Sequence, residues 1–267
     1  MANIRIRNDY ELKLIRQSGQ ITAKALKKAL RVVKPGANLL EIEKVAAEEI
    51  INLGAKLSFP TVGGYKWATC LTVNEELVHG IPRDYELKDG DLLSIDIGAL
   101  YKGWHTDAAW SVLVGKDAPA SQESENLKIG KSDQKKRFLA VGEEALWKAI
   151  RQAKAGNQVG DISQEIQSTV EGAGYSVSQT LVGHGVGKQL HEDPVIPGLG
   201  KKGTGLSLKK NMTIAIEVIY AAGKAEVELA SDGWTYVMKD KSLGGLFEMS
   251  VVVGDKGAEV LTDWRKV

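Results

Sequence analysis

Apolar residues recur every three or four positions in two long segments, about residues 10–33 and 136–154. This spacing predicts two amphipathic α-helices. Each is followed by a shorter unit that contains a glycine turn, a second amphipathic pattern and a glycine stop before strand-like sequence. The first unit is KPGANLLEIEKVAAEEIINLGA and the second is KAGNQVGDISQEIQSTVEGAGY. The chain therefore predicts the order helix, helix, strands, twice.

The two units align at a constant offset of 120 residues, which places Lys34 on Lys154 and Gly54 on Gly174. Two copies are too few for a solenoid, so the repeat favours one pseudo-symmetric domain with a site between its halves, about 10–114 and 136–262. A chance match between two glycine-flanked helices is the alternative.

The segment SIDIGALYKGWHTDAAW, residues 94–110, predicts a β-hairpin that turns around residues 101–103. Its strands are mostly apolar, yet each carries an aspartate, Asp96 and Asp107. A symmetric turn places the two directly opposite each other, where like charges repel. A divalent cation between them would reverse the repulsion, whereas a β-bulge would shift the register.

Two further acids interrupt apolar strand patterns, Glu217 in MTIAIEVIY and Glu248 in GGLFEMSVVV. His184 lies between two glycines in LVGHGVG, where the backbone can approach other elements closely. For each acid alone the alternative is a solvent-facing strand position, and for His184 a structural histidine. Two divalent cations would neutralise the four carboxylates with the imidazole neutral, and this charge balance favours a hydrolytic two-metal site.

Composition narrows the class of protein. The chain has 267 residues, 43% of them hydrophobic and 26% charged, as expected of a soluble globular protein. Its net charge of +1 gives no electrostatic support for nucleic-acid binding. The single cysteine, Cys70, excludes an intrachain disulfide, and the first residues lack the apolar core of a signal peptide. We therefore expect a cytoplasmic location.

Residues 115–136, GKDAPASQESENLKIGKSDQKK, are polar and rich in turn-forming residues. They predict a surface excursion between the hairpin and the third helix, to which we assign no chemistry.

Six stretches, in order, carry a family resemblance: VNEELVHGIP, DIGALYKGWHTDAA, GHGVG, LHEDP, TIAIE and LFEMS. They resemble the motifs of type I methionine aminopeptidases, and the likeness extends over about residues 14–262. The resemblance implies the pita-bread fold, an α+β fold in which two pseudo-symmetric halves surround a central curved antiparallel β-sheet with helices outside. Residues 1–267 would then form a single catalytic domain.

The resemblance also implies an activity. This would be a metalloaminopeptidase that removes the N-terminal methionine from nascent proteins and peptides, preferentially before a small second residue. The implied cofactors are two divalent ions, Co, Mn, Fe or Zn, whose bridging hydroxide attacks the first peptide bond. The implied metal ligands are Asp96, Asp107, His184, Glu217 and Glu248, with Asp107 and Glu248 bridging.

Further roles follow from the same resemblance. Glu217 would also act as general base, His191 would stabilise the oxyanion, and His79 would contact the scissile amide nitrogen. Tyr65, Cys70 and Trp234 would line the methionine pocket, where a thioether packs well against aromatic edges, although ordinary core packing is the alternative. The sequence departs from the common family pattern at Val62, Leu190, Val218 and Met249. At the last of these a histidine is common, and its loss would weaken metal affinity.

Three alternatives differ in testable ways. Proline-specific and creatinase-like hydrolases share the fold but carry an additional N-terminal domain. Type II methionine aminopeptidases carry a helical insertion, for which the 31 positions from Glu217 to Glu248 leave no room. Metal-free binding relatives have lost ligands, whereas this chain keeps all five. As partners we expect N-termini of nascent polypeptides and a transient ribosome association, no membrane, no specific nucleic acid, and a monomeric protein.

Overall fold

Four α-helices are present in the residues that the computed structural model describes, 4–115 and 131–267. Helix α1 begins in a capping box, because the Asn8 side chain accepts from the Glu11 amide and the Glu11 carboxylate accepts from the Asn8 amide, both at 3.0 Å. The helices are α1 (Asp9–Arg31), α2 (Leu39–Asn52), α3 (Lys131–Gln152) and α4 (Val159–Gly172), and the short 3₁₀ helices are η1 (Phe59–Thr61) and η2 (Trp264–Lys266).

The offset of 120 residues is reproduced in the backbone. Helices α2 and α4 begin and end at positions that differ by this offset, and so do the short strands β1 (Lys56–Leu57) and β6 (Ser176–Val177). One expectation needs correction, because α3 begins at Lys131, inside the stretch predicted as an excursion. The rest of that stretch, 116–130, lies outside the described residues.

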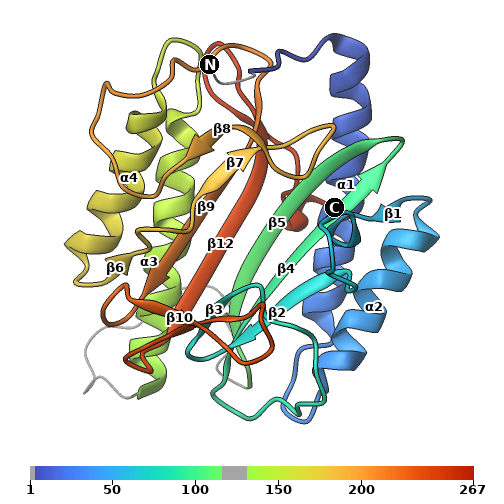
Figure 1. Cartoon of the computed structure of the whole chain (residues 1–267), viewed down its shortest axis with the longest axis vertical. Helices are drawn as coiled ribbons and strands as arrows, with labels where there is room; N and C mark the ends of the chain where they lie inside the picture. The colour runs from blue at the N-terminus through green and yellow to red at the C-terminus, as the bar shows by residue number, and fades with distance from the viewer. Residues whose placement is uncertain (1–3, 116–130) are drawn as a thin grey trace.

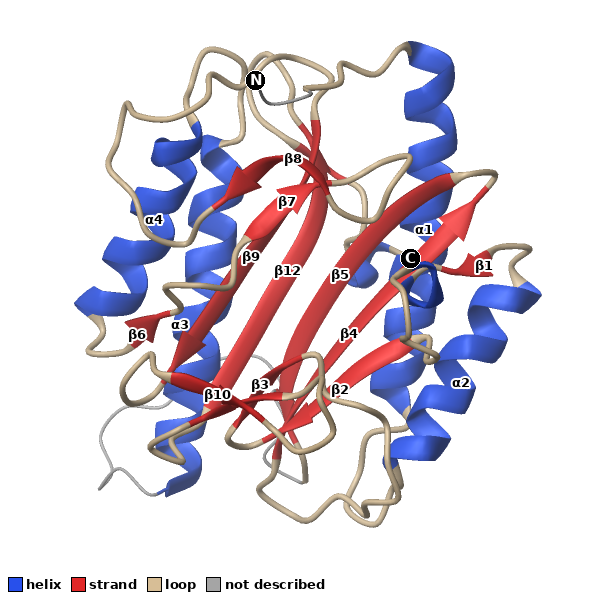
Figure 2. Ribbon diagram, viewed as in Figure 1, coloured by secondary structure: helices blue, strands red, loops and turns tan. Residues whose placement is uncertain are grey.

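Within the described residues ten strands form one antiparallel sheet in the order β1-β4-β5-β12-β9-β7-β8, in which β2 also pairs with β4, β6 with β9 and β13 with β12 (Figures 1 and 2). A three-stranded sheet, β10-β11-β3, lies beside it. The expected α+β architecture is confirmed. The remaining strands are β2 (Thr69–Val73), β3 (Glu76–Val78), β4 (Leu92–Tyr101), β5 (Trp104–Leu113), β7 (Gly183–Gly185), β8 (Glu192–Ile196), β9 (Thr213–Ala221), β10 (Val227–Leu229), β11 (Tyr236–Met238), β12 (Gly244–Val252) and β13 (Glu259–Val260).

The β4–β5 hairpin does not have the expected register. Asp96 pairs with Ala109 and Asp107 pairs with Gly98, so the prediction that the two aspartates lie directly opposite each other is wrong. The turn is formed by residues 102–103, whose φ angles of 49° and 82° are the positive pair that a two-residue hairpin requires. This moves the pairing by two positions, which keeps both aspartates on the same face of the sheet as diagonal neighbours.

The two halves meet where β5 and β12 lie side by side. These strands pair directly at only two positions each. Beyond one end the Ser250 hydroxyl donates to the Asp107 carbonyl and accepts from the Asp107 amide, at 2.8 and 2.9 Å. Beyond the other end Ser111 makes the same pair of bonds to Leu246, at 2.8 and 3.0 Å. We call this junction, with its two serines, the seam.

The two faces of the sheet have opposite character because successive strand side chains point to opposite sides. One face packs on the helices. Its core includes Ile95, Ile97, Ile216, Val218, Phe247 and Met249 together with Leu26, Ile42, Leu146 and Ile166 of the helices. The alternate positions, which include Asp96, Glu217 and Glu248, therefore face away from the helices.

No helix within the described parts of the chain is long and apolar enough to span a bilayer.

We predict that Gly142 of α3 cannot be enlarged. A Cβ there would lie 2.4 Å from Tyr220 Oη and 2.6 Å from Phe247 Cδ2, beneath β9 and β12. Gly142→Ala should lower the unfolding free energy by about 1–3 kcal/mol in urea titrations, despite the helix preference for alanine. Gly172→Ala is the matched control, because nothing lies within 4 Å of its Cβ position. Equal urea midpoints for the two variants would contradict this packing.

Candidate metal centre

Five consecutive strands of the sheet each contribute one side chain to the same cavity. In sheet order these are Asp96 on β4, Asp107 on β5, Glu248 on β12, Glu217 on β9 and His184 on β7. The cavity, of about 660 Å³, lies on the face away from the helices. The residues predicted as ligands from widely separated motifs are thus brought together by the strand order.

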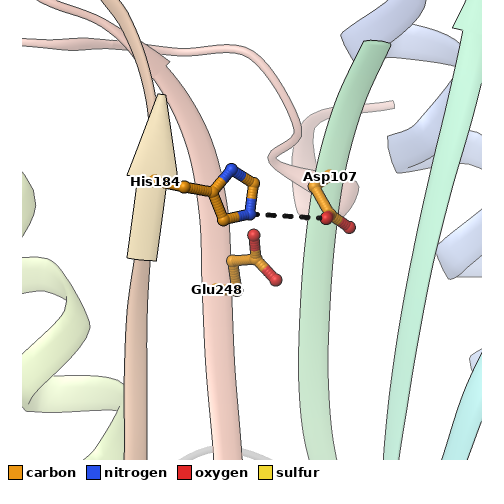
Figure 3. Close-up of side chains that lie close together, drawn as sticks. All are labelled: Asp107, His184 and Glu248. Atoms are coloured by element: carbon orange, nitrogen blue, oxygen red, sulfur yellow. Dashed lines mark ion pairs between the residues drawn. The ribbon is translucent and has the colours of Figure 1, made fainter. Parts of the chain in front are cut away.

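Three of these residues form the tightest group. Atoms of Asp107, His184 and Glu248 that can bind a metal all lie within 4.8 Å of one another, and Figure 3 shows the three side chains converging. His184 Nε2 is 3.4 Å from Glu217 Oε1 and 3.9 Å from Asp107 Oδ2. Glu217 and Glu248 are direct cross-strand partners.

The His184 ring is fixed in one orientation and one tautomer. Its Nδ1 lies 2.9 Å from the Gly185 carbonyl oxygen, which can only accept, so Nδ1 carries the proton and Nε2 presents a lone pair to the carboxylates. A metal-binding histidine usually donates its second ring N–H to a backbone carbonyl, a carboxylate or a water molecule. The flanking glycines are required, because a Cβ at Gly183 would lie 2.5 Å from the Ala215 oxygen and one at Gly185 2.1 Å from the Asp193 oxygen.

Burial perturbs the ionisation of every group in the cluster. Burial raises the pKa of Asp107 to about 7, even though it accepts a hydrogen bond from the Ala108 amide. Burial, and then the charge of Asp107, raise the pKa values of Asp96, Glu217 and Glu248 well above the ordinary range of carboxylic acids. Burial lowers the pKa of His184 to about 3, so its ring is neutral at physiological pH.

The donor set fits divalent cations. Asp96 Oδ1 and Glu248 Oε1 are buried and have no hydrogen-bond partner among the described residues. Such orphaned oxygens are costly in a protein interior unless a cation or ordered water binds them. Four carboxylates and one neutral imidazole are a ligand set for divalent transition metals.

Two further histidines line the same cavity, as expected. The His191 ring lies 4.5 Å from that of His184, nearly perpendicular to it. His79 follows β3 with a φ of 58°, a strained conformation for a residue with a side chain, and its ring packs on Tyr236 at 5.8 Å. Burial lowers the pKa of both imidazoles. The fourth histidine, His105, is buried elsewhere, with Nδ1 2.7 Å from Ser58 Oγ.

A smaller apolar pocket of about 90 Å³ opens beside the cluster, and Asp96, Asp107, His79 and His191 border both cavities. Its apolar lining comprises Phe59, Val62, Tyr65, Cys70, Leu190 and Trp234. The lining thus includes the three residues predicted for a substrate pocket. Sequence reasoning missed Phe59, which resembles any other core phenylalanine until η1 turns it toward the site.

The four departures from the family pattern separate into two groups. Val62 and Leu190 line the small pocket. Val218 and Met249 are fully buried in the core on the helix side of the sheet. The Met249 side chain therefore lies on the face of the sheet opposite the carboxyl groups, so the geometry does not support the influence on metal affinity that was expected of this position.

A buried ion pair adjacent to His191 was also missed. The Arg7 guanidinium pairs with the Glu192 carboxylate, and the two side chains are 3% and 9% exposed. Arg7 Nε also donates to Thr213 Oγ1 at 3.2 Å, and its guanidinium packs 5.2 Å from the centre of the Trp104 ring. A single arginine in a polar stretch near the N-terminus gives no sequence signal that its side chain is buried in an ion pair.

Comparisons with known proteins agree with this geometry. The model of metallopeptidase family M24 matches residues 13–255. Methionine aminopeptidase 1 of Bacillus subtilis is 40% identical over 252 residues, which cover 94% of this chain and 96% of that protein.

Two solved structures resemble this chain, one in sequence and fold and the other in fold alone. The crystal structure of methionine aminopeptidase from Thermotoga maritima has a TM-score of 0.89 and 40% identity, covering 97% of this chain and 99% of that one. The prolidase of Pyrococcus horikoshii has a TM-score of 0.72 at 23% identity and is covered over only 63% of its length, a likeness of fold alone. The expected pita-bread fold is confirmed.

Cation binding to this cluster should release protons. Because the pKa of Asp107 is raised to about 7, the metal-free protein holds that proton below pH 7 and loses it above, whereas His184 is already neutral. Affinity for Mn²⁺ should therefore rise between about pH 5.5 and 7.5, with at least about one proton released at the lower pH. Calorimetry in two buffers of different ionisation enthalpy counts these protons. An affinity independent of pH over this range would contradict the predicted protonation.

Proposed function

The chain belongs to metallopeptidase family M24 and, within it, to the methionine aminopeptidases, and on this premise we propose that it removes methionine from the N-termini of polypeptides. One observation carries the proposal. A buried cluster of four carboxyl groups and a neutral imidazole borders an apolar pocket of about 90 Å³, which is small enough to suit a single side chain. Hydrolytic chemistry and side-chain recognition are thus adjacent.

We propose that Asp96, Asp107, His184, Glu217 and Glu248 would hold two divalent cations. The orphaned oxygens of Asp96 and Glu248 support this assignment. When bound, such cations polarise a peptide carbonyl and lower the pKa of water toward neutrality. Co, Mn, Fe and Zn all suit this mixed oxygen and nitrogen ligand set.

The remaining polar groups then have separate tasks. Glu217 takes the proton of the attacking water and returns it to the leaving amine. Its carboxyl group lines the same cavity as His191 and His79. His191 donates a hydrogen bond to the developing oxyanion, and His79 contacts the scissile amide nitrogen. Both imidazoles line the two cavities, where a peptide bond would cross from one to the other.

The small pocket accepts the methionine side chain. Tyr65 and Trp234 meet edge to face at 5.1 Å, and Cys70 is buried beside them. A polarizable thioether packs favourably against aromatic edges and sulfur. We further propose a preference for a small second residue, as the family resemblance implies.

The wider biological setting is also proposed. We infer that residues 1–267 act as one monomeric catalytic domain in the cytoplasm on N-termini of nascent polypeptides, with a transient ribosome association. The net charge of +1 gives no support for specific nucleic-acid binding.

Metal reconstitution tests the activity. Protein stripped with chelator should be inactive on Met-Ala-Ser, and Co²⁺, Mn²⁺, Fe²⁺ or Zn²⁺ should restore cleavage and bind to about two ions per chain. Leu-Ala-Ser should be cleaved about 10- to 200-fold less efficiently, because the pocket selects side-chain shape. Activity without metal, or none with any metal, would refute the proposal. Cleavage of Xaa-Pro peptides alone would favour a proline-specific peptidase.

The histidine roles are tested by truncation. His191→Ala should lower kcat on Met-Ala-Ser by about 10²- to 10³-fold, as expected for loss of an oxyanion donor. His79→Ala should lower kcat in the same way. Because neither imidazole is assigned as a ligand, both variants should retain the metal content of the unmodified protein, measured by elemental analysis. Glu217→Gln should instead lose both activity and metal. Full activity of His191→Ala would exclude the assigned role.

A further inference from the structure

A buried glutamate of helix α2 binds the segment that builds the small pocket. Glu43 is only 7% exposed, because it lies on the face of α2 that packs into the core. One carboxylate oxygen accepts from the Ala68 amide at 2.7 Å. The other accepts from the Thr69 amide at 2.9 Å and from the Thr69 hydroxyl. These three bonds offset part of the cost of burying a carboxylate, although burial still raises the pKa of Glu43, and they fix residues 68–69 against the helix.

The repeated fold does not require this carboxylate. At the offset of 120, Glu43 corresponds to Ser163 of α4. Ser163 is also buried, but its hydroxyl donates to the Val159 carbonyl of its own helix, at 3.1 Å. Only the half that carries the apolar pocket uses this helix position to hold a neighbouring segment.

Two side chains of the pocket depend on the segment that Glu43 holds. The Thr69 carbonyl accepts a hydrogen bond of 2.7 Å from the Tyr65 hydroxyl, which fixes the aromatic wall. Thr69 also begins β2, in which the next residue, Cys70, pairs with Asp96 of β4. By holding Thr69, Glu43 thus helps to place two pocket residues. Tyr65 bonds to the Thr69 carbonyl, and Cys70 follows Thr69 in β2.

We propose that Glu43 is a positioning residue that sets the shape of the small pocket and thereby its discrimination for methionine. The inference rests on the proposed function and deepens it. A pocket of about 90 Å³ distinguishes side chains only while its walls hold their place. Glu43 is not among the residues that line that pocket, and its hydrogen bonds reach the pocket through Ala68 and Thr69.

Glu43→Gln tests the proposal because it keeps size and shape while one of the two acceptor oxygens becomes an NH₂ group, which cannot accept a hydrogen bond from Ala68 or Thr69. The matched control is Glu48→Gln, the same change on the same helix at a side chain that is 57% exposed. Full-length, metal-loaded proteins are compared on Met-Ala-Ser and Leu-Ala-Ser. Calorimetry with L-methionine and L-leucine gives a binding readout that requires no turnover.

For Glu43→Gln we expect KM for Met-Ala-Ser and Kd for L-methionine to rise about tenfold, the scale expected for a lost hydrogen bond to a charged group. The preference for methionine over leucine should fall by a similar factor, with kcat within about twofold and metal content unchanged. Glu48→Gln should match the unmodified protein. A merely structural glutamate would lower the urea midpoint while KM, Kd and the preference stayed the same, and that result would overturn the proposal.

Thr69 provides a second test if Glu43→Gln does not fold. Thr69→Val removes the hydroxyl bond alone and should weaken L-methionine binding by at least about threefold, whereas Thr69→Ser should restore it. Equal binding by Thr69→Val and the unmodified protein would overturn the proposal. Inactivity of the unmodified protein on every peptide and metal would instead refute the proposed function, and failure to bind L-methionine would refute both.

Discussion

Four carboxyl groups are buried together at the centre of this molecule, and their mutual repulsion is the constraint on which the site depends. Each comes from a different strand, so no single element can relieve the repulsion by moving its own side chain. In the metal-free protein burial raises the pKa values of all four groups, and the charge of Asp107 adds to the shift at the other three, because protonation is the remaining way to remove charge from an apolar interior. Divalent cations can balance the charge of the same oxygens in place of protons, so this site is arranged for a positive charge that the chain itself does not supply.

The alternation of strand residues explains why so much was predictable. An acid within an apolar strand is conspicuous, and four such acids together with His184 indicated the chemistry, while the six motifs in a fixed order indicated the family. The helix repeat was equally predictable, because glycine turns and apolar spacing are local sequence signals. The register of the β4–β5 hairpin was not. It depends on residues 102–103 adopting positive φ angles, a property of the turn that the symmetric position of the aspartates did not reveal.

What sequence reasoning missed shares a physical cause. Phe59, Glu43 and Arg7 act through contacts with residues far along the chain, and nothing in their neighbourhoods distinguishes them from an ordinary core aromatic, a helix surface acid and a polar terminal residue. The difference between Glu43 and Ser163 is present in the aligned sequences, but only the structure shows that Glu43 bonds to another segment whereas Ser163 bonds within its own helix. Near-symmetry of the scaffold therefore helps to find function, since residues that break the repeat are those the scaffold does not need.

The seam between the halves has a consequence of its own. Most neighbouring strands are joined by main-chain bonds that any amino acid can make, but here Ser111 and Ser250 complete the junction with their hydroxyls. The junction of the two halves thus depends partly on two side chains that a mutation can remove, and one of them, Ser250, bonds to the backbone of Asp107. A substitution at Ser111 or Ser250 would therefore change how β5 and β12 are joined without altering any of the five side chains that converge in the cavity.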